Sequence, residues 1–106
     1  MKSHLSFTIS FLLALIPMAG YAQDLEKMLD EAMCYACHQA QEASIGPPWQ
    51  AIAARHASRQ ELMIDVLANK IVNGGGGNWG LIPMVPNQRV SDDQARQMSE
   101  WILEQN

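Results

Sequence analysis

Cysteine is scarce in this sequence: only two of the 106 residues are cysteines, and they lie three positions apart at Cys34 and Cys37. A disulfide between such close neighbours would close almost no loop and would add little stability. The chain also lacks a cluster of basic residues, with 7 lysines and arginines against 11 acidic residues. Binding to nucleic-acid phosphates depends on such clusters, so we expect no nucleic-acid partner.

The sequence has no apolar run of the length that a membrane helix needs, which is roughly 20 residues. Its longest run, residues 5–20, follows a short basic start and ends in small residues at Gly20 and Ala22. This pattern is typical of a secretory signal peptide. We therefore predict a signal peptide over residues 1–22 and one domain over residues 23–106. An uncleaved membrane anchor is the less favoured alternative, and no later stretch could span a membrane.

No segment alternates polar and apolar residues convincingly enough to predict a strand. Helical spacing of apolar residues, capping patterns and breakers predict an all-α domain of about four helices instead. The first two are expected over 24–41, with Asp24 as N-cap, and over 48–56. Two capping boxes, at Ser58–Glu61 and Ser91–Gln94, start the others, which run to Gly74 and to about residue 104.

Residues 74–90 are rich in glycine and proline and cannot form regular structure. An irregular loop of this length is usually functional or disordered. This one is too apolar to remain in water, so we expect it to pack on something that need not be protein. A domain this small also needs a source of stability beyond its own hydrophobic core, such as a metal or a cofactor. The large apolar side chains of the loop are Trp79, Leu81, Ile82, Met84 and Val85.

The pentapeptide CYACH, residues 34–38, allows three interpretations. A redox dithiol is expected beside a βαβ pattern, which is missing here. A zinc site would use Cys34, Cys37, His38 and His56, yet adjacent residues such as Cys37 and His38 point in different directions. The third interpretation is covalent haem attachment, for which C-x-x-C-H is the known pattern. We predict one haem c attached through Cys34 and Cys37 with His38 as an iron ligand, and a redox dithiol as the main alternative.

A second iron ligand is expected from the irregular loop. Met84 lies there between two prolines, which stiffen the segment that would present its thioether. His56 is a weaker candidate, because a lone histidine at a helix end is more often a surface or polar-contact residue. Four other methionines lie on predicted helices at core spacing, where we expect them to fill the core: Met28, Met33, Met63 and Met98.

The segments CYACH, IGPPW, GNWGLIPMVPN and VSDDQARQMSEWIL, in this order and spacing, resemble those of the small bacterial class I c-type cytochromes. The likeness covers essentially the whole of residues 24–105. More narrowly, it resembles the periplasmic kind that carries electrons to nitrite reductases and terminal oxidases. The resemblance implies the class I cytochrome c fold, with its helices wrapped around one covalently bound haem.

The resemblance also implies roles for individual residues. His38 would be the proximal ligand and Met84 the distal one. The Pro47 carbonyl would accept a hydrogen bond from His38 Nδ1, which sets the imidazole tautomer. The Trp79 indole would reach a haem propionate, and the Asn87 side chain would lie near the Met84 sulfur. Arg55 and His56 fall where the family places a partner for the buried propionate.

Taken together, these features predict an electron carrier and not an enzyme. With both axial positions of the iron filled, no substrate can bind. We expect a periplasmic monomer that exchanges electrons with redox protein partners through weak, fast encounters. Two other possibilities stay open: a sensor or enzyme domain in which Met84 leaves the iron, and a subunit of a larger complex.

Overall fold

The computed structural model describes Ala14 and residues 19–106. Most of the predicted signal peptide lies outside the described residues, so its cleavage remains a prediction. In the part that is described, every regular element is helical, which confirms the all-α prediction, and none of these helices has the length and apolar character needed to cross a membrane. The elements are α1 (Ala19–Glu31), η1 (Cys34–Ala36), α2 (Trp49–Arg55), η2 (Ala57–Arg59), α3 (Gln60–Asn73) and α4 (Asp92–Leu103).

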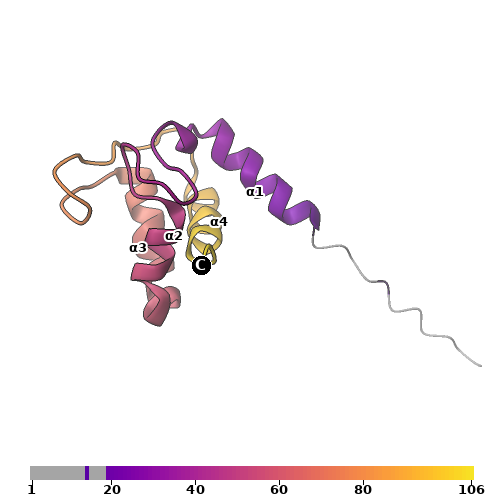
Figure 1. Ribbon diagram of the computed structural model, residues 1–106. Coiled ribbons are helices and arrows are strands. Elements are labelled where there is room, and N and C mark those ends of the chain that lie inside the picture. Colours follow the sequence, from indigo (N-terminus) through magenta and orange to yellow (C-terminus); the bar gives the residue numbers. More distant parts are fainter. Residues whose placement is uncertain (1–13, 15–18) are drawn as a thin grey trace, which may run out of the picture.

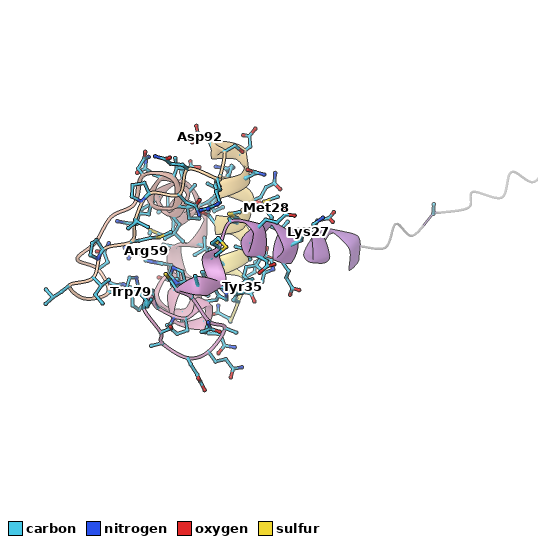
Figure 2. The ribbon with its side chains drawn as sticks, turned by 90° about the horizontal axis from the view of Figure 1, so that it is seen from above. Lys27, Met28, Tyr35, Arg59, Trp79 and Asp92 are labelled. Carbon is cyan, nitrogen blue, oxygen red and sulfur yellow. The ribbon has the colours of Figure 1, made fainter. Side chains whose placement is uncertain are left out.

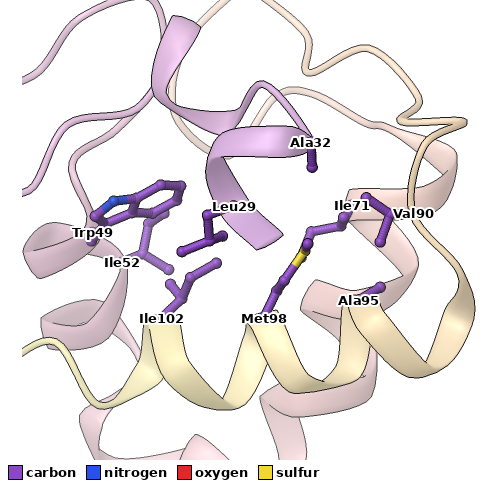
Figure 3. Close-up of a cluster of buried hydrophobic side chains, with 9 residues drawn as sticks. All are labelled: Leu29, Ala32, Trp49, Ile52, Ile71, Val90, Ala95, Met98 and Ile102. Carbon is purple, nitrogen blue, oxygen red and sulfur yellow. The ribbon is translucent and has the colours of Figure 1, made fainter. Parts of the chain in front are cut away.

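Helix α4 is the centre of the packing. It lies against α3 over much of its length and also contacts α2 and α1 (Figure 1). Its inner face carries Ala95, Met98 and Ile102, at helical spacing and almost fully buried. Figure 3 shows how these side chains meet residues from every other α-helix and from the segment before α4. The cluster consists of Leu29, Ala32, Trp49, Ile52, Ile71, Val90, Ala95, Met98 and Ile102.

One predicted capping box is present and the other is not. The Ser91 hydroxyl accepts a hydrogen bond from the Gln94 N–H, and the Gln94 side chain accepts one from the Ser91 N–H. Ser58, in contrast, lies within η2 and caps nothing; α3 begins at Gln60, whose side-chain amide reaches the Leu103 carbonyl, 2.8 Å away, at the end of α4. A tertiary contact has replaced the local cap that the sequence predicted.

The first predicted helix is wrong at both ends. Helix α1 already begins at Ala19, so Asp24 lies inside it and is not its N-cap. It ends at Glu31, because Met33 adopts a left-handed backbone conformation with φ of 64°. The Cys34 carbonyl then accepts hydrogen bonds from the N–H groups of Cys37 and His38. The apolar spacing continues past Glu31, but the chain turns there and Cys34 packs against the core.

The other helix boundaries agree closely with the sequence. Helix α2 occupies most of the predicted span 48–56, and α3 ends where Gly74 was expected to end it. The segment 74–90 is irregular as predicted, with one addition: an isolated antiparallel bridge joins Gly75 to Met84. This bridge closes the base of the loop that extends from the helices in Figure 1.

Candidate cofactor site

The two thiols of CYACH lie on a 3₁₀ turn and not on an α-helix. Side chains three positions apart eclipse one another in a 3₁₀ helix, which is the spacing between Cys34 and Cys37, the residue directly after η1. Both are free and partly buried. The spacing therefore allows the two thiols to lie side by side, although the element at Cys34 is a 3₁₀ turn and not the predicted helix.

Burial raises the pKa of the Cys34 thiol, and the neighbouring Cys37 adds to this effect, while a hydrogen bond from the backbone of Cys34 opposes it. Reactive redox cysteines work as thiolates and have a depressed pKa. A thiol whose pKa is shifted upwards is poorly suited to disulfide exchange. For Cys34, the direction of this shift is opposite to the one that a reactive redox thiol needs.

The imidazole of His38 is buried and firmly oriented. Its Nδ1 lies 2.7 Å from the Pro47 carbonyl oxygen, the contact that the resemblance implied. Because a carbonyl only accepts hydrogen bonds, Nδ1 carries the proton and Nε2 keeps its lone pair. The His38 ring is thus held in the tautomer that a metal ligand needs.

Two residues that the sequence did not single out complete the surroundings of His38. The ring of Trp49 stacks on the imidazole, with 4.6 Å between ring centroids and 21° between planes. Gly46 is required on steric grounds, since a Cβ there would lie 2.6 Å from His38 Cε1. Their place next to Pro47 in IGPPW was the available signal, and only the fold shows that the segment covers the imidazole.

The Trp49 indole also has an unpaired polar group. Its N–H is buried without a hydrogen-bond partner in the protein. In Figure 3 the nitrogen lies on the side of the ring that faces away from Leu29. A buried donor without an acceptor costs roughly 1–3 kcal/mol, so such a group points to an acceptor that the protein does not supply.

The zinc interpretation finds no support in the geometry. Within residues 19–106, no cluster of three or more histidine, cysteine or carboxylate side chains could hold a metal ion. His56 is buried, and its Nδ1 lies 3.4 Å from the Arg59 guanidinium, which donates to it. Burial lowers the pKa of His56, and the nearby charges of Arg59 and Arg55 lower it further.

Met84 differs from the other methionines in its setting. It is partly buried at the edge of the core, in irregular backbone that the bridge to Gly75 holds. Met98 fills the core as predicted, and Met28 and Met63 are partly buried. The expectation for Met33 is wrong: it lies outside any helix and is 58% exposed, because the left-handed turn directs it outwards.

The rest of the loop presents apolar side chains that no protein atoms cover. Leu81, Ile82 and Val85 are largely exposed, and Trp79 is 46% exposed. The Arg55 guanidinium lies over the Trp79 ring, 4.7 Å from its centroid, and donates to the Asn78 carbonyl 2.6 Å away. Figure 2 shows Trp79 on the side of the molecule opposite to Lys27 of α1. The interaction with Arg55 fixes one flank of the loop.

Asn87 has an unexpected set of partners. Its side-chain N–H₂ donates to the Ala32 carbonyl, 2.8 Å away, and its Oδ1 accepts from the Arg89 N–H at 3.1 Å. Among the hydrogen bonds of the described chain, none joins this side chain to the Met84 sulfur. Asn87 thus ties the end of the loop to the residue that follows α1.

These residues fit a covalently bound haem. Two free thiols lie three positions apart at a turn, and the imidazole of the next residue has an available Nε2. The uncovered apolar loop and the buried Trp49 N–H both lack partners that a large apolar ring with acidic substituents would supply. The donor set of imidazole and thioether suits an iron centre with both axial positions filled.

Comparison with known proteins places the chain in one well-defined group. A family model described as "Cytochrome c" matches residues 23–106. The chain is 38% identical over 92 residues to cytochrome c-552 of Hydrogenobacter thermophilus, covering 87% of this chain and 92% of the relative. It is 37% identical over 91 residues to cytochrome c-551 of Pseudomonas aeruginosa, covering 86% of each. The crystal structure of wild-type Nitrosomonas europaea cytochrome c552 superimposes with a TM-score of 0.72 at 38% identity, covering 76% of this chain and 99% of the other.

Proposed function

This chain belongs to the cytochrome c family, and from that premise we propose that it carries single electrons between redox proteins of the periplasm, with His38 and Met84 as the axial ligands of its haem. That it is a small electron-transfer protein with a covalently attached c-type haem, and not an enzyme, follows from the family. The periplasmic site of action, the ligands and the kind of partner belong to the proposal.

The attachment is assigned to Cys34 and Cys37. Each S–H would add across one vinyl group of the porphyrin, with the sulfur bonding to one carbon and the hydrogen going to the other. The three-residue spacing at the η1 turn would let both thiols reach the two vinyl groups along one edge of the ring.

The observation that carries the ligand assignment is the hydrogen bond from His38 Nδ1 to the Pro47 carbonyl. It holds the imidazole in the tautomer that leaves Nε2 for iron. The stacked Trp49 and the close approach of Gly46 restrict rotation of the same ring. Iron bound there, when the haem is present, supplies the ferrous–ferric couple.

Met84 is assigned as the opposite ligand on its setting in the loop. A thioether favours ferrous iron and so gives a relatively high reduction potential. We assign the Trp79 indole to a haem propionate, an arrangement that the Arg55 guanidinium next to that ring would support electrostatically. Arg55 and His56 remain candidates for the second propionate contact.

The proposed partners follow from the charge of the domain and from the apolar side chains near the residues that would hold the haem. Residues 23–106 carry a negative formal charge, because all 11 acidic residues lie there. This argues against a partner that recognises a ring of lysines. Apolar side chains next to the attachment turn and the His38 loop, Met33 and Ile45, are 58% and 60% exposed. A nitrite reductase or a terminal oxidase would dock on such a patch, and the protein acts as a monomer.

Release of the exported chain would follow cleavage between Ala22 and Gln23. The small residues at Gly20 and Ala22 support this cleavage. Intact mass spectrometry of protein made in a periplasm-maturing host checks it: a chain that starts at Gln23 and carries one haem is expected. A retained N-terminus would instead favour the membrane-anchor alternative.

The central test of the function is Met84→Ala in the holoprotein. The haem stays attached, since the two thioethers and His38 remain. The weak far-red sulfur-to-iron band of the ferric protein should disappear and the reduction potential should fall. The reduced variant should bind carbon monoxide readily, whereas the wild type should resist it. Absorption spectroscopy and redox titration measure all three.

Met63→Leu is the matched control. Met63 is a partly buried methionine on α3, and a volume-conserving change there costs little. The band, the potential and the resistance to carbon monoxide should all persist. If Met84→Ala keeps the band, the ligand is another residue. If the wild type already binds carbon monoxide, the sensor or enzyme alternative is favoured.

A further inference from the structure

The backbone of Met84 is held by both of its polar groups to a single residue. The Met84 N–H donates to the Gly75 carbonyl at 2.7 Å, and the Gly75 N–H donates to the Met84 carbonyl at 3.0 Å. Gly75 lies two residues beyond the end of α3. The pair therefore attaches the middle of the long loop to the C-terminus of a helix whose Ile71 belongs to the core.

Gly74 makes this close approach possible. It caps α3 with a φ of 74°, and its N–H donates to the Lys70 carbonyl at 2.8 Å. A Cβ at this position would lie 2.5 Å from the Met84 carbonyl oxygen and 2.9 Å from the Pro86 nitrogen. Both neighbours are backbone atoms that no side-chain rotation can remove. The Met84 backbone thus lies in a space that only glycine leaves open.

The loop is attached again just beyond Met84. The Asn87 N–H donates to the Ile71 carbonyl at 3.1 Å, so the last turn of α3 holds the chain on the far side of Pro86 as well. Met84 lies between these two attachments, and its side chain packs against the edge of the core. None of these contacts involves a metal or a cofactor.

We propose that Gly74 and Gly75 are positioning residues for Met84: they dock its backbone on the C-terminus of α3, so that the sulfur is presented to the iron by the protein itself. This inference depends on the proposed role of Met84 as a ligand. A ligand held in place before it binds loses little conformational freedom on binding and is released less readily. The Met84–iron bond therefore depends on α3 as well as on the iron.

The test compares Gly74→Ala with Gly77→Ala in the holoprotein. Both glycines have positive φ, 74° and 88°, a region in which an added side chain is strained at either position. Only at position 74 does the added methyl group meet Met84, since nothing lies within 4 Å of a Cβ at position 77. Gly74→Ala should weaken the far-red band, lower the reduction potential and make the reduced protein bind carbon monoxide. Gly77→Ala should leave all three unchanged.

The outcomes separate this inference from the function on which it depends. If Met84→Ala keeps the far-red band, the ligand assignment fails. If Met84→Ala loses the band while Gly74→Ala and Gly77→Ala behave alike, the ligand assignment stands and the docking role is refuted.

Amide hydrogen exchange keeps the inference testable even where Gly74→Ala does not mature. In the wild-type holoprotein, the amides of Gly75 and Met84 should exchange much more slowly than that of the fully exposed Leu81. The protection should persist in Met84→Ala, because the bridge uses only backbone atoms. Exchange as fast as that of Leu81, or protection that disappears in Met84→Ala, would overturn the proposal.

Discussion

Met33 is a residue at which backbone strain lies next to the cofactor attachment. It is the non-glycine residue with positive φ in the described chain, at 64°, and it directly precedes Cys34. A left-handed conformation costs an ordinary residue roughly 1–2 kcal/mol. The strain is localised at the reversal that separates α1 from the η1 turn, and so at the point where the chain turns towards the core.

Replacing Met33 with glycine should therefore stabilise the protein. The strain relieved is partly offset by the greater freedom of glycine in the unfolded chain, which leaves a gain of about 0.5–1 kcal/mol in the free energy of unfolding. Guanidinium denaturation of the oxidised holoprotein measures it. Met33→Ala, which removes the side chain but keeps the strain, should give no gain. Equal stability of the two variants would show that the backbone at this position is not strained.

His56 predicts a pH dependence of stability. Burial and the charges of Arg59 and Arg55 hold the pKa of its imidazole below the ordinary value of 6.5. At pH values just below 6.5, His56 binds a proton in the unfolded chain but stays neutral in the folded protein. The free energy of unfolding should therefore decrease as pH falls below about 6.5 and level off below the folded pKa.

The His56→Gln variant should lack this contribution, and an NMR titration of the His56 ring in the holoprotein gives its pKa directly. A pKa above 6.5 would mean that an anion lies next to the ring. A haem propionate would be that anion, and the sign of the stability change would then be reversed.

At the scale of elements, α3 and α4 begin in different ways. Helix α4 has a complete capping box at Ser91 and Gln94. Asp92 and Asp93 lie in its first turn, where negatively charged carboxylates interact favourably with the helix dipole. Helix α3 follows directly from η2, and the Gln60 side chain joins it to the end of α4. The two serines that look alike in the sequence therefore have different contributions to stability.

Ser91→Ala should lower the free energy of unfolding by about 1 kcal/mol, because it leaves the Gln94 N–H without its acceptor. Ser58→Ala is the matched control and should change stability by less than about 0.5 kcal/mol. Denaturation midpoints of the two variants, measured side by side, decide the point. A loss at Ser58 as large as that at Ser91 would contradict the structure.

For the molecule as a whole, the haem is expected to complete the core. The protein part is small, and its loop leaves Leu81, Ile82 and Val85 largely exposed. Contact with an apolar ring would remove such surface from water and would stabilise the folded protein by about 25 cal/mol for each Å² of apolar surface buried. Folding and cofactor binding should consequently be coupled.

Cys34→Ala combined with Cys37→Ala should yield haem-free protein that is largely unfolded. Far-UV circular dichroism should show little helix, and heating should produce no cooperative transition. The wild-type holoprotein, measured in the same buffer, should melt cooperatively. A cooperative transition in the haem-free variant would show that the helices form a sufficient core alone.

Local features of the sequence were enough to predict much of this protein. Neighbouring residues determine the all-α class, the C-terminus of α3 at Gly74 and the N-terminus of α4 at Ser91. The same is true of the chemistry of Cys34 and Cys37, and the sequence displays all of these neighbours directly. The cofactor and the family follow from short motifs whose spacing carries the chemistry. Met84 could be selected as a ligand candidate because prolines flank it in a loop, which is also a local property.

Other features depend on contacts between distant segments, and only the folded structure shows them. Three such features differ from what the local sequence pattern predicts or go beyond it. They are the turn at Met33, the missing cap at Ser58 and the stacking of Trp49 on His38. The same is true of the hydrogen bonds from Asn87 to Ala32 and from Met84 to Gly75. Helical periodicity continues through CYACH, yet the left-handed backbone of Met33 ends the helix before this motif, and residues 34–36 form a 3₁₀ turn whose Cys34 packs against the core.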